Sequence, residues 1–149
     1  MKSYAGMAIV LLTGIAIGVV SAGRLNAQGK AAGMRIHSLY VDAHGESHFR
    51  DTELKWVKDD PSGKTSERFP ATDIIFRETS GDYDLAWHPA PRRQYVINLD
   101  AGVEITASDG EKRVIGAGEV VLVEDTTGKG HLSQHYENKI RHSIFIPIE

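Results

Sequence analysis

The chain has 149 residues, no cysteine and a formal net charge of −3. This length fits a single domain, and the lack of cysteine excludes disulfides and thiolate chemistry. A mildly acidic chain without a basic stripe is a poor candidate for binding nucleic acid. The sequence also has no Gly-x-Ser-x-Gly elbow, no phosphate-binding loop and no His-Glu-x-x-His pair. Serine hydrolases, nucleotide-binding proteins and zinc peptidases therefore find no support.

The N-terminus has the layout of a secretory signal peptide. Lys2 supplies a basic head, residues 7–20 are apolar or small apart from one threonine, and further small residues follow. Cleavage is expected after Ala27, with Ala22 as the second choice. The alternative is an uncleaved membrane anchor, although the run is short and rich in glycine and alanine for a span of about twenty residues. We therefore expect residues 1–27 to be a signal peptide and the domain to be periplasmic or secreted, with membrane attachment only if cleavage fails.

The rest of the chain consists of short runs of strand character separated by turn residues. Their spacing of about 8 to 12 residues predicts an all-β sandwich or barrel. Asp109-Gly110 predicts a tight hairpin because this pair accepts positive φ angles, and 116–118 predicts a second turn. Residues 59–66 are expected to form a polar, mobile loop. The expected strands are 34–41, 47–57, 73–79, 94–99, 103–108, 112–115, 120–124, 131–136 and 143–148.

One of these strands alternates polar and bulky side chains. Gln94 and Asn98 share one face, which we expect to line a polar cavity, while Tyr95, Ile97 and Leu99 share the other. The bulky face is expected to pack in the core. It would need cover from the N-terminal strands or from a second subunit, and a homodimer is therefore expected.

Two histidines stand beside predicted strands. His88 lies with Gln94 at the entrance to the apolar run of 94–99, and His131 follows the Gly-rich turn Thr-Gly-Lys-Gly, where a new strand would begin. Two strand-borne histidines this far apart in sequence can converge only if the sheet curls back on itself. The pattern predicts a barrel with a polar site inside it.

The spacing of glycines and histidines around these positions resembles the two motifs of the cupins. In the first motif Gly81 leads to His88, and Gln94 stands where the family has a glutamate. In the second motif Gly118 leads through an apolar strand to His131. The sequence is most similar to a group of small bacterial single-domain cupins, whose fold is a double-stranded β-helix, or jelly-roll barrel.

This resemblance implies a domain organisation. It covers residues 70–148, which would form the cupin core, and it places the strands of 34–57 as added edge strands. The whole cupin domain would span 28–149, after the signal peptide at 1–27.

The resemblance also implies a metal site. Two of the four usual cupin ligands are matched by His88 and His131, the acidic ligand becomes the neutral Gln94, and the second histidine of the first motif becomes Ala90. We expect His88, Gln94 and His131 to be the ligands of a divalent ion, with Fe, Mn, Ni or Zn as candidates. The alternative is a pocket without metal, in which the histidines form hydrogen bonds.

A second group of residues is expected to bind the ligand itself. A guanidinium presents a planar fork to carboxylates and phosphates, and an aromatic side chain can form a wall. The alternative for the two arginines is a solvated loop without a ligand, and the alternative for the tryptophan is packing in the core. The expected ligand-binding residues are Trp87, Arg92, Arg93, Asn98 and His135.

These observations lead to one expectation with one alternative. The chain is expected to be an exported cupin that binds a small polar or anionic molecule in its barrel, with or without help from a metal ion. The alternative is a non-catalytic module that binds or senses a small ligand without metal. The sequence names neither a reaction nor a catalytic residue.

Overall fold

The computed structural model describes residues 33–148. All regular secondary structure in this part of the chain is β-strand. The all-β class expected from the sequence is confirmed for this part of the chain. The expected signal peptide or anchor at residues 1–27 lies outside the described residues. Across 33–148 no helix has the length and apolarity that a membrane crossing requires.

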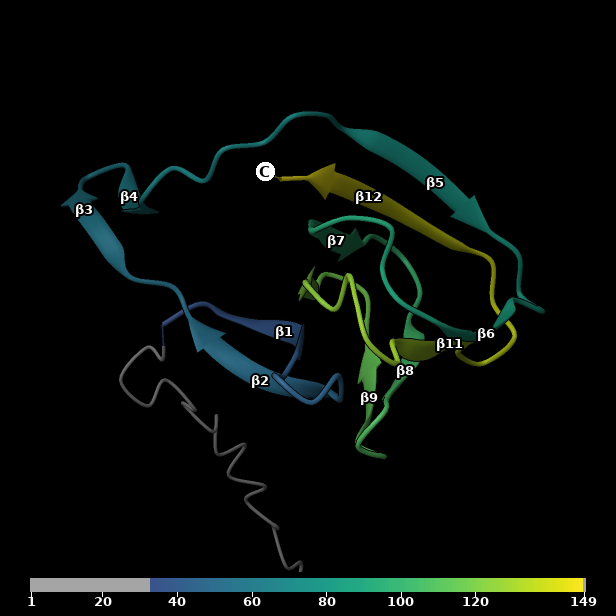
Figure 1. Cartoon of the computed structure of the whole chain (residues 1–149). Helices are drawn as coiled ribbons and strands as arrows, with labels where there is room; N and C mark the ends of the chain where they lie inside the picture. The colour runs from purple at the N-terminus through teal and green to yellow at the C-terminus, as the bar shows by residue number, and fades with distance from the viewer. Residues whose placement is uncertain (1–32, 149) are drawn as a thin grey trace, which may run out of the picture. The chain divides into compact units, whose positions relative to one another are not determined.

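The strands of the described region follow one another with short turns (Figure 1). They are β1 (Arg35–Val41), β2 (Ser47–Glu53), β3 (Trp56–Asp60), β4 (Gly63–Ser66), β5 (Ile75–Thr79), β6 (Asp84–His88), β7 (Gln94–Asn98), β8 (Val103–Ala107), β9 (Lys112–Ile115), β10 (Val120–Val123), β11 (His131–His135) and β12 (Arg141–Pro147).

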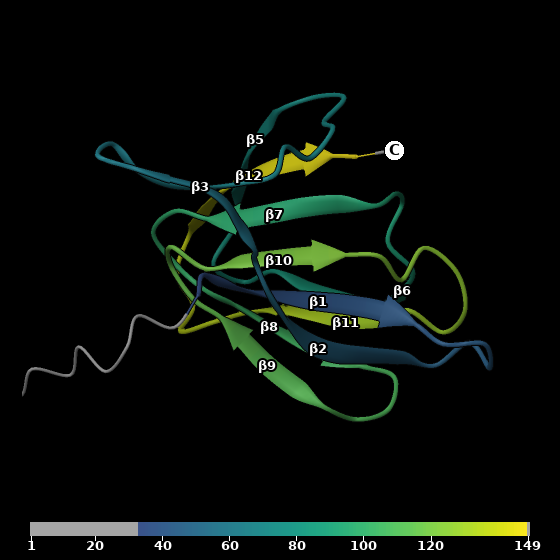
Figure 2. The same ribbon diagram turned by 90° about the vertical axis from the view of Figure 1, so that its left-hand side faces the viewer.

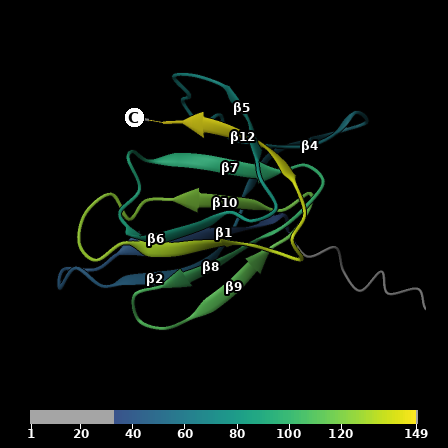
Figure 3. The same cartoon turned by 90° about the vertical axis from the view of Figure 1, so that its right-hand side faces the viewer.

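Ten of these strands form two sheets that face each other. The larger has the order β2-β1-β10-β7-β12-β5 and the smaller the order β6-β11-β8-β9. Figures 2 and 3, from opposite sides, show one sheet lying behind the other, the arrangement of a β-sandwich or a flattened barrel. Neighbouring strands are antiparallel except β1 and β10, which run parallel.

The remaining two strands correct one expectation. Residues 59–66, expected to be a mobile polar loop, form the turn and flanks of the β3–β4 hairpin. The hairpin was hidden because its strands are almost wholly exposed and carry lysine and aspartate, so no apolar alternation marks them. The hairpin extends to one side of the two sheets (Figure 1).

The core lies between the sheets and follows from the alternation of side chains along the strands. Inward-facing residues of the larger sheet meet those of the smaller sheet. The buried hydrophobic cluster consists of Leu39, Phe49, Ala90, Val96, Val103, Ile105, Ala107, Ile115, Val121 and Val123.

The two faces of β7 correct another expectation. Gln94 and Asn98 point inward and are buried, as expected, but Leu99 just after the strand is 50% exposed and is not a core residue. Tyr95, on the same face, packs edge-on against Phe69 from the segment before β5, with ring centroids 6.0 Å apart. The bulky row therefore lies on the outer surface and is partly covered by this chain itself.

The two sheets are joined along one edge. There, the N–H of Ser47 in β2 donates to the Ser108 hydroxyl (2.7 Å), and the N–H of Ser108, just after β8, donates to the Ser47 hydroxyl (2.6 Å). Further along, Arg113 of β9 donates to Asp51 of β2 (2.6 Å). We call this side, where β2 meets β8 and β9, the closed edge.

The opposite side is not joined in this way. Strand β5 pairs only with β12 and strand β6 only with β11, so these two edge strands do not pair with each other. The link between them is the short turn at Gly81, and the guanidinium of Arg77 lies over the ring of Tyr83 at 5.6 Å. We call this side, between β5 and β6, the open edge.

Candidate functional site

A cavity of about 360 Å³ lies between the two sheets. Both sheets contribute to its wall, and the lining residues with exposed side chains all come from β5, β6 and the turn after β6. These exposed lining residues are Arg77, Leu85, Pro89 and Pro91. The mouth of the cavity therefore lies at the open edge.

Most of the cavity wall is apolar. Branched aliphatic side chains project into it from three central strands, β7, β8 and β10, and an aromatic ring comes from β12. These residues are Val96, Val103, Ile105, Val121, Val123 and Phe145. A cavity of this size and lining, with a few polar groups at fixed places, is typical of a site for a small organic molecule.

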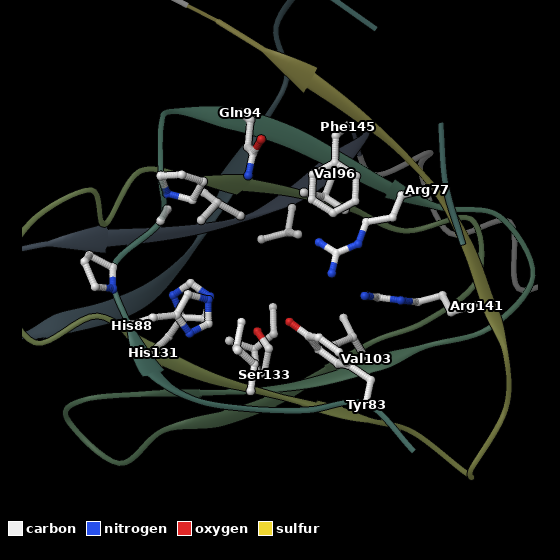
Figure 4. A pocket seen from close by; sticks show the side chains of 17 residues that line it. Arg77, Tyr83, His88, Gln94, Val96, Val103, His131, Ser133, Arg141 and Phe145 are labelled. Carbon is white, nitrogen blue, oxygen red and sulfur yellow. The ribbon is translucent and has the colours of Figure 1, made fainter. Parts of the chain in front are cut away.

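The two histidines form one polar end of the cavity. His88 and His131 are direct partners in the antiparallel pairing of β6 with β11. Their ring centroids are 4.4 Å apart with an angle of 53° between the planes, and both rings line the cavity (Figure 4). The convergence expected from the sequence is therefore present, produced by two adjacent strands of the smaller sheet.

Each imidazole is held by its Nδ1 atom. The Nδ1 of His131 lies 2.7 Å from Oδ2 of Asp125, whose side chain is fully buried. The Nδ1 of His88 lies 2.7 Å from the carbonyl oxygen of Ala86. Carboxylate and carbonyl oxygens accept hydrogen bonds, so both Nδ1 atoms carry the proton. In the neutral form of each ring, the Nε2 atom then keeps a lone pair.

Sequence reasoning missed Asp125, which lies six residues before His131. The six-residue separation gives no helical or strand periodicity that would bring the two side chains together. The link depends on the loop fold: the backbone oxygen of Asp125 accepts from the N–H of Ala90 (3.0 Å), which joins this loop to the one after His88. An acidic residue shortly before a strand-borne histidine was the only available signal.

A glycine permits the close approach of the two histidine strands. Gly130 has φ +71°, and a Cβ at this position would lie 2.1 Å from the carbonyl oxygen of His88. The hydroxyl of Ser47 donates to the carbonyl of Gly130 (2.7 Å), and the N–H of Lys129 donates to the carbonyl of Gly45 (2.9 Å). The β1–β2 turn therefore braces the loop that carries the site.

Gln94 reaches the cavity from the other sheet. It is buried in β7 and lines the cavity together with His88 and His131 (Figure 4). The three residues expected to hold a metal thus share one cavity, and their role as ligands stays a prediction. Within residues 33–148, no group of three or more His, Cys, Asp or Glu side chains is placed to hold a metal ion.

Two arginines that sequence reasoning missed form the second polar end. Arg141 of β12 is buried, with 6% of its surface exposed, and donates through Nη1 to Oδ1 of Asn98 (3.2 Å). Arg77 of β5 lies over the ring of Phe145 at 5.4 Å. Burial lowers the pKa of the Arg141 guanidinium, with Tyr83 acting to raise it and Arg77 to lower it further.

Neither arginine has an acidic partner in the described part of the chain. No Asp or Glu oxygen in residues 33–148 lies within 4.0 Å of the guanidinium of Arg77 or Arg141. The sequence of β12 could have indicated that Arg141 points inward, because Arg141 shares a face of this strand with Ser143 and Phe145. The expected strand began at residue 143, two residues too late to include it.

The residues expected to bind the ligand lie outside the cavity lining. Trp87 is half exposed because it neighbours the inward-facing His88 and so points outward. Arg92 and Arg93 lie in the exposed turn before β7, where Arg93 pairs with Glu124 (2.6 Å).

The other two expected residues lie at the margins. Asn98 is fully buried, donates to the carbonyl of Ile115 (2.7 Å) and supports Arg141 from behind. His135 lies beyond Ser133, the last residue of β11 in the cavity wall, and its Nδ1 is buried without a partner among the described residues. A direct ligand contact for these residues stays a prediction without support from their position.

Comparison with known proteins adds little to this geometry. No family model matches the chain, and no curated protein matches it. The matches among solved structures include protein NMB1881 from Neisseria meningitidis, with a TM-score of 0.41 and 16% identity over 56% of this chain and 88% of that one. The function of the chain therefore has to be inferred from its own cavity.

Proposed function

We propose that the chain is an exported, cupin-like barrel that binds a small organic anion in the cavity between its sheets. The observation that carries this proposal is Arg141, a buried guanidinium without a carboxylate partner in the described residues. A buried charge is costly unless it is paired. An anionic ligand would supply the missing partner, and guanidinium groups favour carboxylates and phosphates.

The charge of the whole cavity supports the same conclusion. Arg77 stands beside Arg141, and the lining contains no Asp or Glu. The nearest buried carboxylate, Asp125, is bonded to His131 and does not line the cavity. The apolar walls favour a ligand with a carbon skeleton over an inorganic ion. The cavity volume of about 360 Å³ suits a molecule of the size of an aromatic or short aliphatic acid.

The test compares acids with their neutral counterparts. A panel of aromatic and aliphatic carboxylates and phosphate esters is screened against the matching amides and alcohols by ligand-observed NMR, and binders are measured by calorimetry. We expect acids to bind at least about tenfold more tightly than their amides, since a hydrogen bond to a charged group contributes about 1.5–3 kcal/mol. Equal binding of acids and amides, or no bound acid, would contradict the proposal.

Two arginine variants separate this proposal from the one drawn from sequence. Arg141→Met should weaken binding of the best acid by about 10- to 100-fold, because it removes the buried partner of the anion. Arg92→Met is the matched control in the exposed turn and should leave the affinity unchanged. The opposite pattern would move the anion site to the turn that carries Arg92 and Arg93.

A divalent metal ion is the second candidate. It is favoured by the two imidazoles, whose Nδ1 atoms are bonded away from the cavity, as is usual for metal-binding histidines. His88, Gln94 and His131 would hold it, and it would polarise an oxygen atom of the bound molecule. Without an acidic ligand, the ion would keep its full charge in a cavity that already holds two arginines. This makes the organic anion the stronger candidate.

Elemental analysis decides on the metal. Untagged protein prepared without chelator would contain about one Fe, Mn, Ni or Zn per chain if the site exists, and His88→Ala and His131→Ala would both lose it. Metal that persists in both variants would place the ion elsewhere. In the alternative without metal, a non-catalytic module that binds or senses its ligand, the ligand recovered after long incubation would be chemically unchanged.

A further inference from the structure

The cavity has two chemically different ends. In Figure 4 the side chains of Arg77 and Arg141 reach in from one side, and the rings of His88 and His131 lie on the other. Between them lie apolar side chains, with Val96 and Phe145 from the larger sheet, and the hydroxyl groups of Ser133 and Tyr83. A ligand whose anionic group pairs with the arginines therefore has its other end near the histidines.

The histidine end offers hydrogen-bond acceptors. The carboxylate of Asp125 fixes the proton of His131 on Nδ1, and the carbonyl of Ala86 does the same for His88. Both Nε2 atoms then present lone pairs, and a single hydrogen-bond donor on the ligand can lie between rings whose centroids are only 4.4 Å apart. If the ligand placed a group here that can only accept hydrogen bonds, the Nε2 lone pairs would stay without a donor.

The donor at this end is neutral. An ammonium group would need a carboxylate within contact distance, and no Asp or Glu lines the cavity. It would also place a third positive charge in a space that already contains Arg77 and Arg141. A hydroxyl group, in contrast, can donate to one Nε2 without adding charge.

From these steps we infer that the ligand is a small hydroxy acid, with its anionic group at Arg77 and Arg141 and its hydroxyl between the two imidazole rings, where it donates to Nε2 of His131. This inference rests on the proposed binding of an organic anion and adds the chemistry of the ligand's far end. Asp125 acts as a positioning residue, since it reaches the ligand only through His131.

The first test changes the ligand and leaves the protein intact. Affinities are measured for benzoate, 4-fluorobenzoate and 4-hydroxybenzoate, and for pentanoate and 5-hydroxypentanoate, with protein that was treated with chelator and then dialysed. In at least one series the hydroxy acid should bind about tenfold more tightly than its parent, the gain from one buried hydrogen bond. The fluorine compound controls for size and should gain little.

The second test changes the acceptor. In Asp125→Asn the side-chain amide can donate to Nδ1 of His131, which moves the ring proton to Nε2 and turns an acceptor into a donor. A hydroxyl can also accept from this new Nε2–H, so the hydroxy acid is compared with its acceptor-only methyl ether, 4-methoxybenzoate. The preference for the hydroxy acid over the ether should fall at least about threefold, while the affinity for the parent acid is retained. Asp100→Asn is the matched control, because Asp100 bonds Nδ1 of His142 in the same way on the exposed surface.

The outcomes separate this inference from the proposed function. If the parent acids bind and the hydroxyl brings no gain, the anion site stands and the hydroxy-acid inference is wrong. If the preference over the methyl ether is unchanged in Asp125→Asn, the hydroxyl does not donate to His131 and the inference is also wrong. If no acid of either series binds, both the proposed function and the inference fall. Nitrogen NMR of the histidine rings shows the tautomers directly in the unmodified protein.

Discussion

The closed edge and the open edge of the two sheets treat their arginines in opposite ways. At the closed edge Arg113 donates to Asp51 (2.6 Å) and Glu111 (2.7 Å) and lies over the ring of Phe49. On the side of the open edge Arg141 is more deeply buried, and within residues 33–148 its guanidinium bonds only the amide oxygen of Asn98. In this part of the chain, the arginine where the sheets join has acidic partners, whereas the arginine of the cavity has none.

This difference separates residues that stabilise the fold from residues that serve a ligand. A charged side chain with several partners in its own chain contributes to folding. A buried one without such partners lowers stability, and its presence points to a partner from outside. The backbone offers a similar comparison, between a glycine packed against the histidine site and a glycine in an outer hairpin. Three predictions test it, from the largest effect to the smallest.

The largest effect is expected from glycine substitutions. Gly130→Ala would place a Cβ 2.1 Å from the carbonyl of His88, in addition to the unfavourable φ of +71°. We expect a loss of about 3–5 kcal/mol in the free energy of unfolding, together with separation of His88 from His131. Gly110→Ala, in the β8–β9 hairpin, has a φ of +95° but nothing within 4 Å, and should cost only about 1–2 kcal/mol.

Urea denaturation of both variants measures these costs. Equal losses would mean that the tight contact at Gly130 does not contribute to the site, and that the backbone angle alone determines both costs.

An intermediate effect is expected from the two arginines. Arg113→Met should lower the free energy of unfolding by about 1–2 kcal/mol, because it removes two ion pairs and a ring contact at a largely buried position. Arg141→Met should change it by less than about 1 kcal/mol, since relief from burying an unpaired charge offsets the bond lost to Asn98.

Chemical denaturation and acid binding are measured on the same two proteins. The comparison breaks down if Arg141→Met proves the more destabilising variant, or if Arg113→Met is the one that loses the ligand.

The smallest effect concerns pH at the closed edge. Hydrogen bonds from His48 to Asp109 (2.6 Å) and then to Asp42 (3.2 Å) raise the pKa of His48 above 6.5. A raised pKa means that the protonated form stabilises the fold. This contribution is fully present below pH 6.5 and is lost as the pH rises through the folded value. NMR titration should give a raised pKa in the native chain and a smaller shift in Asp109→Asn.

The free energy of unfolding, measured below pH 6.5 and again above the raised pKa of His48, provides the second readout. The loss of stability with rising pH should be smaller in His48→Gln than in the unmodified chain. An identical pH dependence in both proteins would show that this histidine does not link the β1–β2 turn to the β8–β9 turn.

Much of the strand pattern was predictable because it depends on local chemistry. Asp109-Gly110 forms the expected hairpin, Gly118 has the positive φ of the expected turn, and the bounds of most strands agree within two residues. Strand β6 was not identified, although its last residue, His88, was singled out. The β3–β4 hairpin was missed because it lacks an apolar face.

The site was predictable only where sequence motifs carried it. His88, Gln94 and His131 all line one cavity. Arg77 and Arg141 were missed because they belong to the strands β5 and β12, which pair with each other and are part of neither motif. Their proximity follows from the register of this pair, which no local pattern specifies.

The parallel pairing of β1 with β10 has a consequence for how the protein is made. Residue 37 lies opposite residue 121, so the hairpin of β1 and β2 leaves the ribosome long before its neighbour in the larger sheet exists. Until β10 is synthesised, one side of β1 exposes unpaired backbone groups that are prone to pair with other chains. The larger sheet can therefore be completed only when nearly all of the chain has been made.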